Sequence, residues 1–173
     1  SKKNKSSIIR ENQFTYFANW YYSAIRELVS IIYWGNDYRI LANSVYPKIT
    51  PKQAEKAVKL LVDLGMIKKM PSGRYIQIKK TITFDDRVTS LAMQKCQKQT
   101  IELGLLNLEN VKNEYRDIST LTLRVSEEGF YRTKEEIKHF KEKLIGIINS
   151  DEATDRVYQI NIQLFPVSKI LKE

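Results

Sequence analysis

The sequence has few of the residues from which disulfides, metal centres and phosphate-binding loops are built. Of its 173 residues, one is cysteine, one is histidine and six are glycine. A single Cys96 excludes a disulfide within the chain and a cysteine-rich zinc site, and it indicates a reduced, cytoplasmic protein. The lone His139 excludes sites with several histidines, and the scattered glycines form no phosphate-binding loop. We therefore expect no bound metal and no cofactor.

Candidate catalytic groups are equally sparse. Cys96 and His139 could in principle form a nucleophile and its base, but Cys96 lies on the apolar side of an expected helix without an activating neighbour. Acidic pairs such as Glu127 and Glu128 are the charges that favour the start of a helix. We expect no catalytic residues and no enzymatic activity.

Long hydrophobic runs are also missing, since no apolar stretch approaches the roughly 20 residues of a membrane-spanning helix. The chain nevertheless has a hydrophobic fraction of 42% and contains ten Tyr, six Phe and two Trp. This composition is typical of a packed globular protein.

Positive charge is concentrated in the first half of the chain. Residues 1–82 contain 15 Lys and Arg against 5 Asp and Glu, whereas residues 83–173 contain 14 against 15. The halves therefore carry +10 and −1, which indicates that the first half binds a polyanion. Nucleic acid is the favoured polyanion. A membrane surface is the alternative, but the basic residues form no single cluster beside a large apolar face.

The first half has the order of elements found in a winged helix-turn-helix domain. Apolar residues spaced three and four apart predict a helix from Phe14 to Ile32, and a short helix is expected around residues 38–45. A third helix follows at residues 51–64. A hairpin with strands at 66–70 and 74–80 completes the domain, which we place at residues 10–82.

The third helix has the clearest local signals. Thr50 is a good N-cap, Pro51 suits the first helical position, and Gln53 stands where a capping box requires it. Gly65 is placed to adopt the left-handed conformation that ends the helix. These four residues predict both ends of the helix.

A row of lysines lies on the face of this helix opposite its apolar stripe, because the spacing i, i+4, i+7 keeps them together. The residues that we expect to contact DNA are Lys48, Lys52, Gln53, Lys56, Lys59, Lys68, Lys69, Arg74 and Lys79. Arginine is missing from the helix and Glu55 lies among the lysines, so phosphate contacts are better supported than base reading. A plain solvated face, or a winged helix that docks proteins, is the alternative.

The second half predicts a small domain of helix, strand, helix and strand at residues 83–168. Its helices are expected at 87–108 and from 127 to about 148, and its strands at 118–125 and 157–165, where apolar and polar residues alternate. The whole chain is therefore expected to have an α+β fold.

The polar faces of these two strands are most simply expected to face solvent, and the alternative is that they form a candidate surface for a ligand or protein partner. Its residues are Arg116, Thr120, Thr122, Arg124, Gln159, Asn161 and Gln163. Two strands are too few for a stable sheet, so they must recruit the hairpin, pack on their helices or meet a second subunit. We expect a homodimer. Strands joined through the intervening helix would be parallel with a right-handed crossover.

Two stretches of the second half resemble the signatures of a bacterial paralogous family of regulator-like proteins whose C-terminal domain has no known function. They are Arg116-Asp117-Ile118-Ser119-Thr120-Leu121-Thr122 and the segment from Asp155 to Pro166. Phe17–Tyr21, Ile49–Pro51 and Leu64–Ile67 are similar too. The resemblance implies that members are longer, with an additional helix-turn-helix segment before this region, and that this chain is their C-terminal part.

The sequence thus predicts a cytoplasmic transcription regulator that binds double-stranded DNA through a basic winged helix. The alternative is a winged-helix module of a larger regulator that dimerises or docks a protein and does not itself bind DNA.

Overall fold

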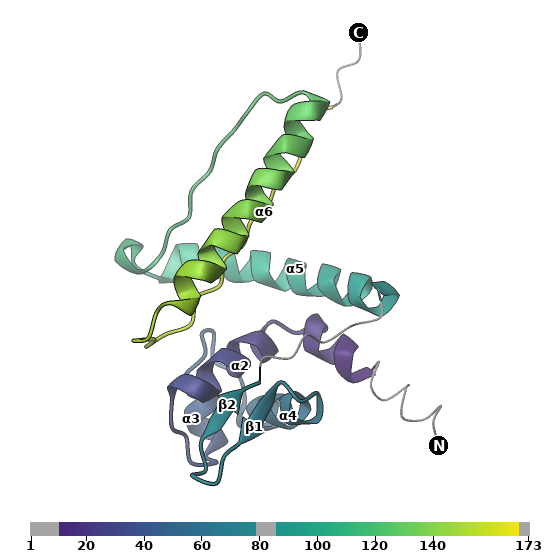
Figure 1. The fold of residues 1–173 in the computed structure, drawn as a ribbon. Helices are drawn as coiled ribbons and strands as arrows, with labels where there is room; N and C mark the ends of the chain where they lie inside the picture. Colours follow the sequence, from purple (N-terminus) through teal and green to yellow (C-terminus); the bar gives the residue numbers. More distant parts are fainter. Residues whose placement is uncertain (1–10, 79–85, 170–173) are drawn as a thin grey trace. The chain divides into compact units, whose positions relative to one another are not determined.

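The computed structural model describes residues 11–78 and 86–169, and the chain forms two compact units (Figure 1). The first unit comprises residues 1–111 together with 156–173, and the second comprises residues 112–155. The domain boundary predicted near residues 82 and 83 lies outside the described residues.

Three helices and a hairpin form the core of the first unit. The helices are α2 (Tyr21–Ile31), α3 (Tyr38–Asn43) and α4 (Pro51–Asp63), and the strands are β1 (Ile67–Lys69) and β2 (Tyr75–Gln77). The strands are antiparallel, with Lys68 opposite Ile76. Helix α2 contacts α3, α4 and β2, and α4 also contacts α3 and β1. Their shared core consists chiefly of Tyr16, Tyr22, Ile25, Leu28, Val29, Trp34, Leu41, Val45, Val58, Leu61, Met66 and Ile67.

Both predicted ends of α4 are confirmed. The Thr50 hydroxyl accepts a hydrogen bond from the Gln53 amide nitrogen at 3.2 Å, and Gln53 Oε1 accepts from the Thr50 amide nitrogen at 2.8 Å. At the other end Gly65 has φ of +67°, and its N–H donates to the Val62 carbonyl oxygen. Met66 N–H donates to the Leu61 carbonyl oxygen, which completes a Schellman motif.

The prediction of one continuous helix from Phe14 to Ile32 is wrong. Residues 11–18 are helical, the helix is interrupted at Asn19 and Trp20, and α2 begins at Tyr21. The Gln99 side chain lies at this interruption: its amide nitrogen donates to the Ala18 carbonyl oxygen at 3.0 Å, and its Oε1 accepts from Trp20 N–H at 3.1 Å. The distant glutamine thus satisfies backbone groups that the interruption leaves without helical partners.

The rest of the described chain is mainly helical. Helix α5 (Asp86–Asn110) belongs to the first unit, whereas the 3₁₀ turn η1 (Asn113–Tyr115) and α6 (Glu127–Asn149) belong to the second. The predicted helices at 87–108 and 127–148 are confirmed, and Ser126 caps α6 by accepting a hydrogen bond from Gly129 N–H. Overall the fold is mixed, with one two-stranded antiparallel sheet among the described residues, in line with the α+β expectation.

The two strands predicted in the second half are not formed. Residues 118–125 and 157–165 have no regular secondary structure, and β1 and β2 are the only strands in the described part of the chain. A strand is defined by hydrogen bonds to a neighbouring strand, and alternation of side chains does not supply that neighbour. The predicted parallel pairing is therefore absent from the described residues as well.

Candidate nucleic-acid interface

The lysines of α4 lie on the face that the core leaves open. Their positions are set by the opposite side of the helix, where Ala54, Ala57, Val58 and Leu61 are buried. The lysines on or just before this helix are all exposed: Lys48, Lys52, Lys56 and Lys59. Within the described residues none of them is within ion-pair distance of a carboxylate. Their positive charge is therefore available to a ligand.

Gln53 is less available than its neighbours. It is half-buried, and its carbonyl oxygen accepts from both the backbone nitrogen and the hydroxyl of Thr50 in the capping box. Reading an adenine would need both its amide nitrogen and its carbonyl oxygen. The structure thus ties Gln53 to the start of α4, a role that its place in the sequence had already indicated.

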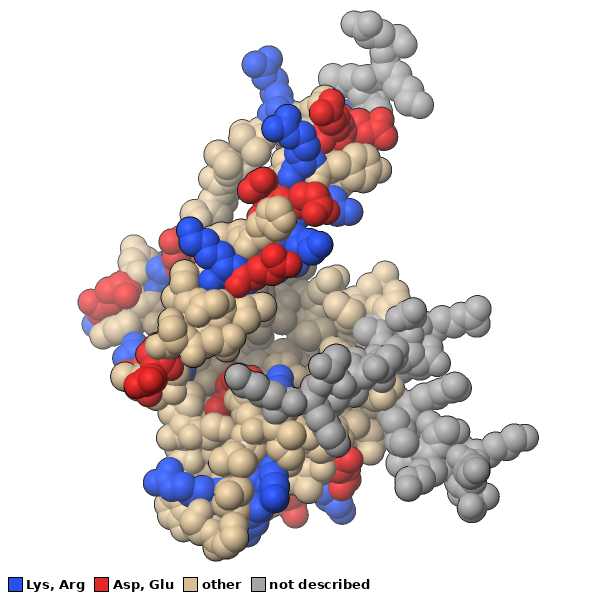
Figure 2. Space-filling view, in the orientation of Figure 1, with Lys and Arg blue, Asp and Glu red and all other residues tan. Residues whose placement is uncertain are grey.

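The β1–β2 hairpin adds three described cations, and two of them are held in place. Lys69 Nζ donates to Asn36 Oδ1 at 3.0 Å, and the Arg74 guanidinium lies 5.4 Å from the centre of the Tyr33 ring. Lys68 is exposed. Figure 2 shows Lys and Arg side chains gathered over the part of the first unit that contains the hairpin. Lys79, also predicted to contact DNA, lies outside the described residues.

Packing of aromatic residues holds the hairpin against the helices. Trp34, only 3% exposed, stacks on Tyr75 of β2 with ring centres 5.1 Å apart. The side-chain nitrogen of Gln77 donates to the Arg26 carbonyl oxygen at 3.1 Å and to Glu27 Oε2 at 2.7 Å, both on α2. The hairpin cations therefore have a defined position relative to the lysines of α4.

Sequence reasoning missed two features of this surface. Tyr33 is exposed beside Arg74, and no periodic pattern marks it, because it lies in the turn between α2 and α3. Arg39 is a further exposed cation, but it forms a salt bridge of 2.8 Å with Asp37 and so lowers the pKa of that carboxyl through hydrogen bonding. Two opposite charges only two residues apart, at Asp37 and Arg39, could have indicated this salt bridge from the sequence.

The second candidate surface is not assembled as predicted. Thr120, Thr122 and Arg124 are exposed, as are the apolar side chains between them, so this segment has no buried face. Arg116 is half-buried and has interactions of its own.

In the other segment the polar side chains Gln159 and Gln163 are exposed, whereas Asn161 donates to the Thr100 carbonyl oxygen of α5 at 2.6 Å. Asn161 thus links its segment to α5 within the first unit. The sequence had placed Asn161 on a polar face open to solvent, with a ligand or partner surface as the alternative.

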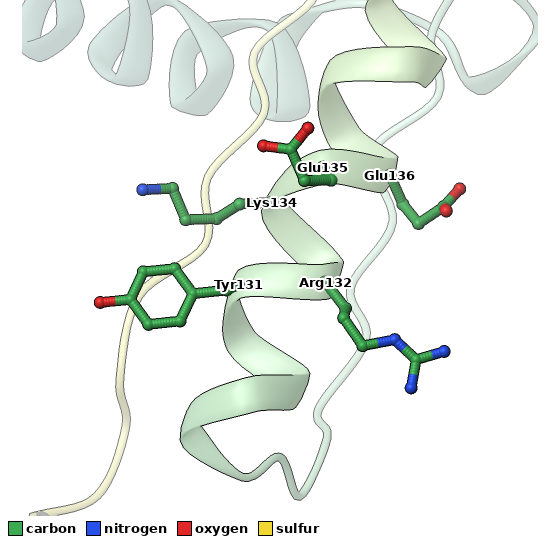
Figure 3. Close-up of a pocket in the computed structure, with 5 residues that line it drawn as sticks. All are labelled: Tyr131, Arg132, Lys134, Glu135 and Glu136. Carbon is green, nitrogen blue, oxygen red and sulfur yellow. The ribbon is translucent and has the colours of Figure 1, made fainter.

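Nothing in the described residues resembles an enclosed catalytic or metal site. The pocket shown in Figure 3 is lined by residues of one turn and a half of α6, and their side chains project in different directions without converging. No group of three or more His, Cys, Asp or Glu residues suited to a metal ion occurs in the described ranges. Among the same residues, no helix combines the length and the apolar character needed to cross a bilayer.

Cys96 is half-buried in α5, and burial raises the pKa of its thiol. A raised pKa keeps the thiol protonated, which is the opposite of what activates a cysteine nucleophile.

Comparison with known proteins gives a family and nothing more specific. Neither the curated proteins nor the solved structures include a match to this chain. A family model described as a domain of unknown function (DUF4423) matches residues 1–167, which is nearly the whole sequence. The chain therefore belongs to the DUF4423 family.

Proposed function

We propose that this chain binds duplex DNA as part of a transcription regulator, with the phosphate backbone as its main point of contact. The order α2, α3, α4, β1 and β2 is that of a winged helix-turn-helix domain, in which α4 would be the recognition helix and the hairpin the wing. The observation that carries the proposal is the row of exposed lysines along α4, free of ion pairs within the described residues.

The chemistry of this surface favours phosphate contacts over base reading. Lysine is a compact charge that suits phosphate, whereas the bidentate reading of guanine is mainly the work of arginine, and α4 contains none. Gln53 is occupied by the capping box. Binding should therefore depend strongly on salt and only weakly on the sequence of the duplex.

The test is a salt titration of duplex binding by three proteins. Wild-type affinity should fall steeply with salt, with a slope of about 0.9 for each phosphate contacted. A variant with Lys52→Glu, Lys56→Glu and Lys59→Glu should lose binding.

The matched control places the same change of charge on α6, as Lys138→Glu, Lys141→Glu and Lys143→Glu. These lysines are exposed too, in a helix where acidic and basic side chains are interspersed (Figure 2). The control should bind DNA nearly as well as the wild type. An equal loss of DNA affinity in the two variants would mean that the net charge of the protein governs binding. The assignment of the DNA contact to the lysines of α4 would then be wrong.

The competing function is a winged-helix module that docks a protein or dimerises. It is favoured by the large apolar side chains that remain exposed in the second half, among them Leu121, Phe140 and Phe165. A chain that shows no duplex binding at low salt would support this function in place of ours.

A further inference from the structure

Residues 157–165 form an extended segment whose backbone lacks a strand partner. No backbone-to-backbone hydrogen bond involves these residues within the part of the chain that the structure describes. One carbonyl oxygen, that of Ile160, accepts from the Gln159 side-chain nitrogen at 3.3 Å. A row of N–H and C=O groups without backbone partners in an extended segment is a template for pairing with another strand. The segment thus resembles an edge strand to which no second strand is paired.

One side of the segment is attached to its own chain. Val157 packs against the core of the first unit, and Asn161 donates to the Thr100 carbonyl oxygen of α5 at 2.6 Å. Side chains two and four residues apart point to the same side of an extended chain, so the odd-numbered residues form this attached side. The even-numbered residues form the other side.

That other side is apolar and uncovered. It consists of Tyr158, Ile160, Ile162 and Leu164, which are 60%, 51%, 39% and 40% exposed. The sequence had predicted amides facing solvent, and Gln159 and Gln163 are exposed, but the apolar residues opposite them are exposed as well. Together these four apolar residues expose on the order of 400 Å² at roughly 200 Å² per large side chain. A contiguous apolar patch of several hundred Å² on a soluble domain marks an interaction site.

The order of residues in the segment is a chemical palindrome centred on Asn161. Reading outward, Ile160 matches Ile162, Gln159 matches Gln163, Tyr158 matches Leu164 and Val157 matches Phe165. An antiparallel strand paired with its own copy about Asn161 places these matched residues opposite each other. Apolar residues then meet apolar residues on one face and glutamine meets glutamine on the other.

We propose that residues 157–165 pair antiparallel with the same residues of a second copy of this chain, with a two-fold axis at Asn161. The palindrome identifies the partner as a second copy, since a two-fold contact requires a surface that is complementary to itself. The nine residues include no charged side chain, so pairing brings no like charges together. The inference does not rest on DNA binding.

The register gives a sharp test by cysteine cross-linking in a Cys96→Ala background. Residues opposite each other in an antiparallel pair have Cα atoms about 4.5–5.5 Å apart, within the range that a disulfide spans. The double variant Gln159→Cys and Gln163→Cys should form a disulfide-linked dimer on mild oxidation, and it leaves Asn161 and its bond to α5 intact.

Gln163→Cys alone is the matched control. In the proposed register, position 163 of one chain and position 163 of its partner are four residues apart along the strands. Their Cα atoms are then about 14 Å apart, which is too far for a disulfide. The single variant should stay monomeric on a non-reducing gel. Equal cross-linking of the single and double variants would overturn the register.

Sedimentation of the unmodified 173-residue chain tests the pairing itself. At micromolar concentrations it should sediment as a species of twice 20.3 kDa. Ile160→Lys with Ile162→Lys sets lysines opposite each other across the pair and should yield the single chain, whereas Leu121→Lys with Leu123→Lys, in the other exposed segment, should remain a dimer. A wild-type species of 20.3 kDa would overturn the proposal. It would be expected if residues 157–165 paired with a segment of their own chain.

Discussion

The capping box of α4 makes a prediction about stability whose size follows from the structure. Thr50→Ala removes the hydroxyl that accepts from Gln53 N–H at 3.2 Å, but it keeps the backbone N–H that donates to Gln53 Oε1 at 2.8 Å. Loss of an N-cap hydroxyl lowers the free energy of unfolding by about 1 kcal/mol. Thr50→Ser keeps the hydroxyl and should cost only a few tenths of that.

Gln53→Ala removes the reciprocal bond, whose donor is exposed to water, so its cost should be about 0.5 kcal/mol. Because the Thr50 hydroxyl also lies 3.0 Å from Gln53 Oε1, the two losses should not add. We expect the double variant to lose about 0.5 kcal/mol less free energy of unfolding than the two single variants lose together.

Urea unfolding followed by tryptophan fluorescence is the appropriate assay. Both tryptophans, Trp20 and Trp34, belong to the unit that contains α4, so the signal reports on that unit. If Thr50→Ala and Thr50→Ser unfold at the same urea concentration, the hydroxyl does not hold the start of α4 and the reasoning is refuted.

Two other predictions concern stability. Gly65→Ala should lower the free energy of unfolding by about 1 kcal/mol in urea titrations, because the φ of +67° is strained for alanine. Gly146→Ala, near the C-terminal end of α6, where an added Cβ meets no atom within 4 Å, should instead raise helix stability. Changes of the same sign in both variants would contradict this account. Burial raises the pKa of Tyr22, so its neutral form is favoured in the folded chain. Stability should be independent of this group below about pH 10 and fall above it by up to about 1.4 kcal/mol per pH unit, as the unfolded chain ionises first. Tyr22→Phe should make the alkaline loss shallower, and an unchanged pH profile would show that the hydroxyl is not buried in solution.

The features of the fold that sequence could predict are those with local causes. The start of α4 is indicated by Thr50 and Gln53, and its end by Gly65. The start of α6 is indicated by Ser126. Each of these residues acts on backbone groups only a few residues away. The hairpin turn at 71–73 is local for the same reason, and Gly73 has the positive φ that such a turn uses. These elements are found where the sequence placed them.

The errors concern features with distant causes. The helix predicted from Phe14 is interrupted where Gln99, some 80 residues later, bonds to the backbone. The two predicted strands have the right alternation but no hydrogen-bonded neighbour in the described chain. Alternation predicts that a segment has an apolar and a polar face, but it does not predict which face packs against the rest of the chain.

The candidate site shows the same division. The exposure of Lys52, Lys56 and Lys59 follows from helical periodicity and was predicted, as was the basic hairpin. The contact of Trp34 with Tyr75, which holds the hairpin to the helices, joins residues 41 apart in sequence, and no local pattern predicts it.

The central claim is that the lysine face of α4 binds DNA phosphates, and the most direct test is the salt dependence of single neutral variants. Each phosphate-contacting lysine contributes about one unit to the slope of log affinity against log salt. Lys56→Gln should therefore reduce the slope by about one unit, and Lys138→Gln on α6 should leave it unchanged. The same slope for wild type and both variants would contradict the account.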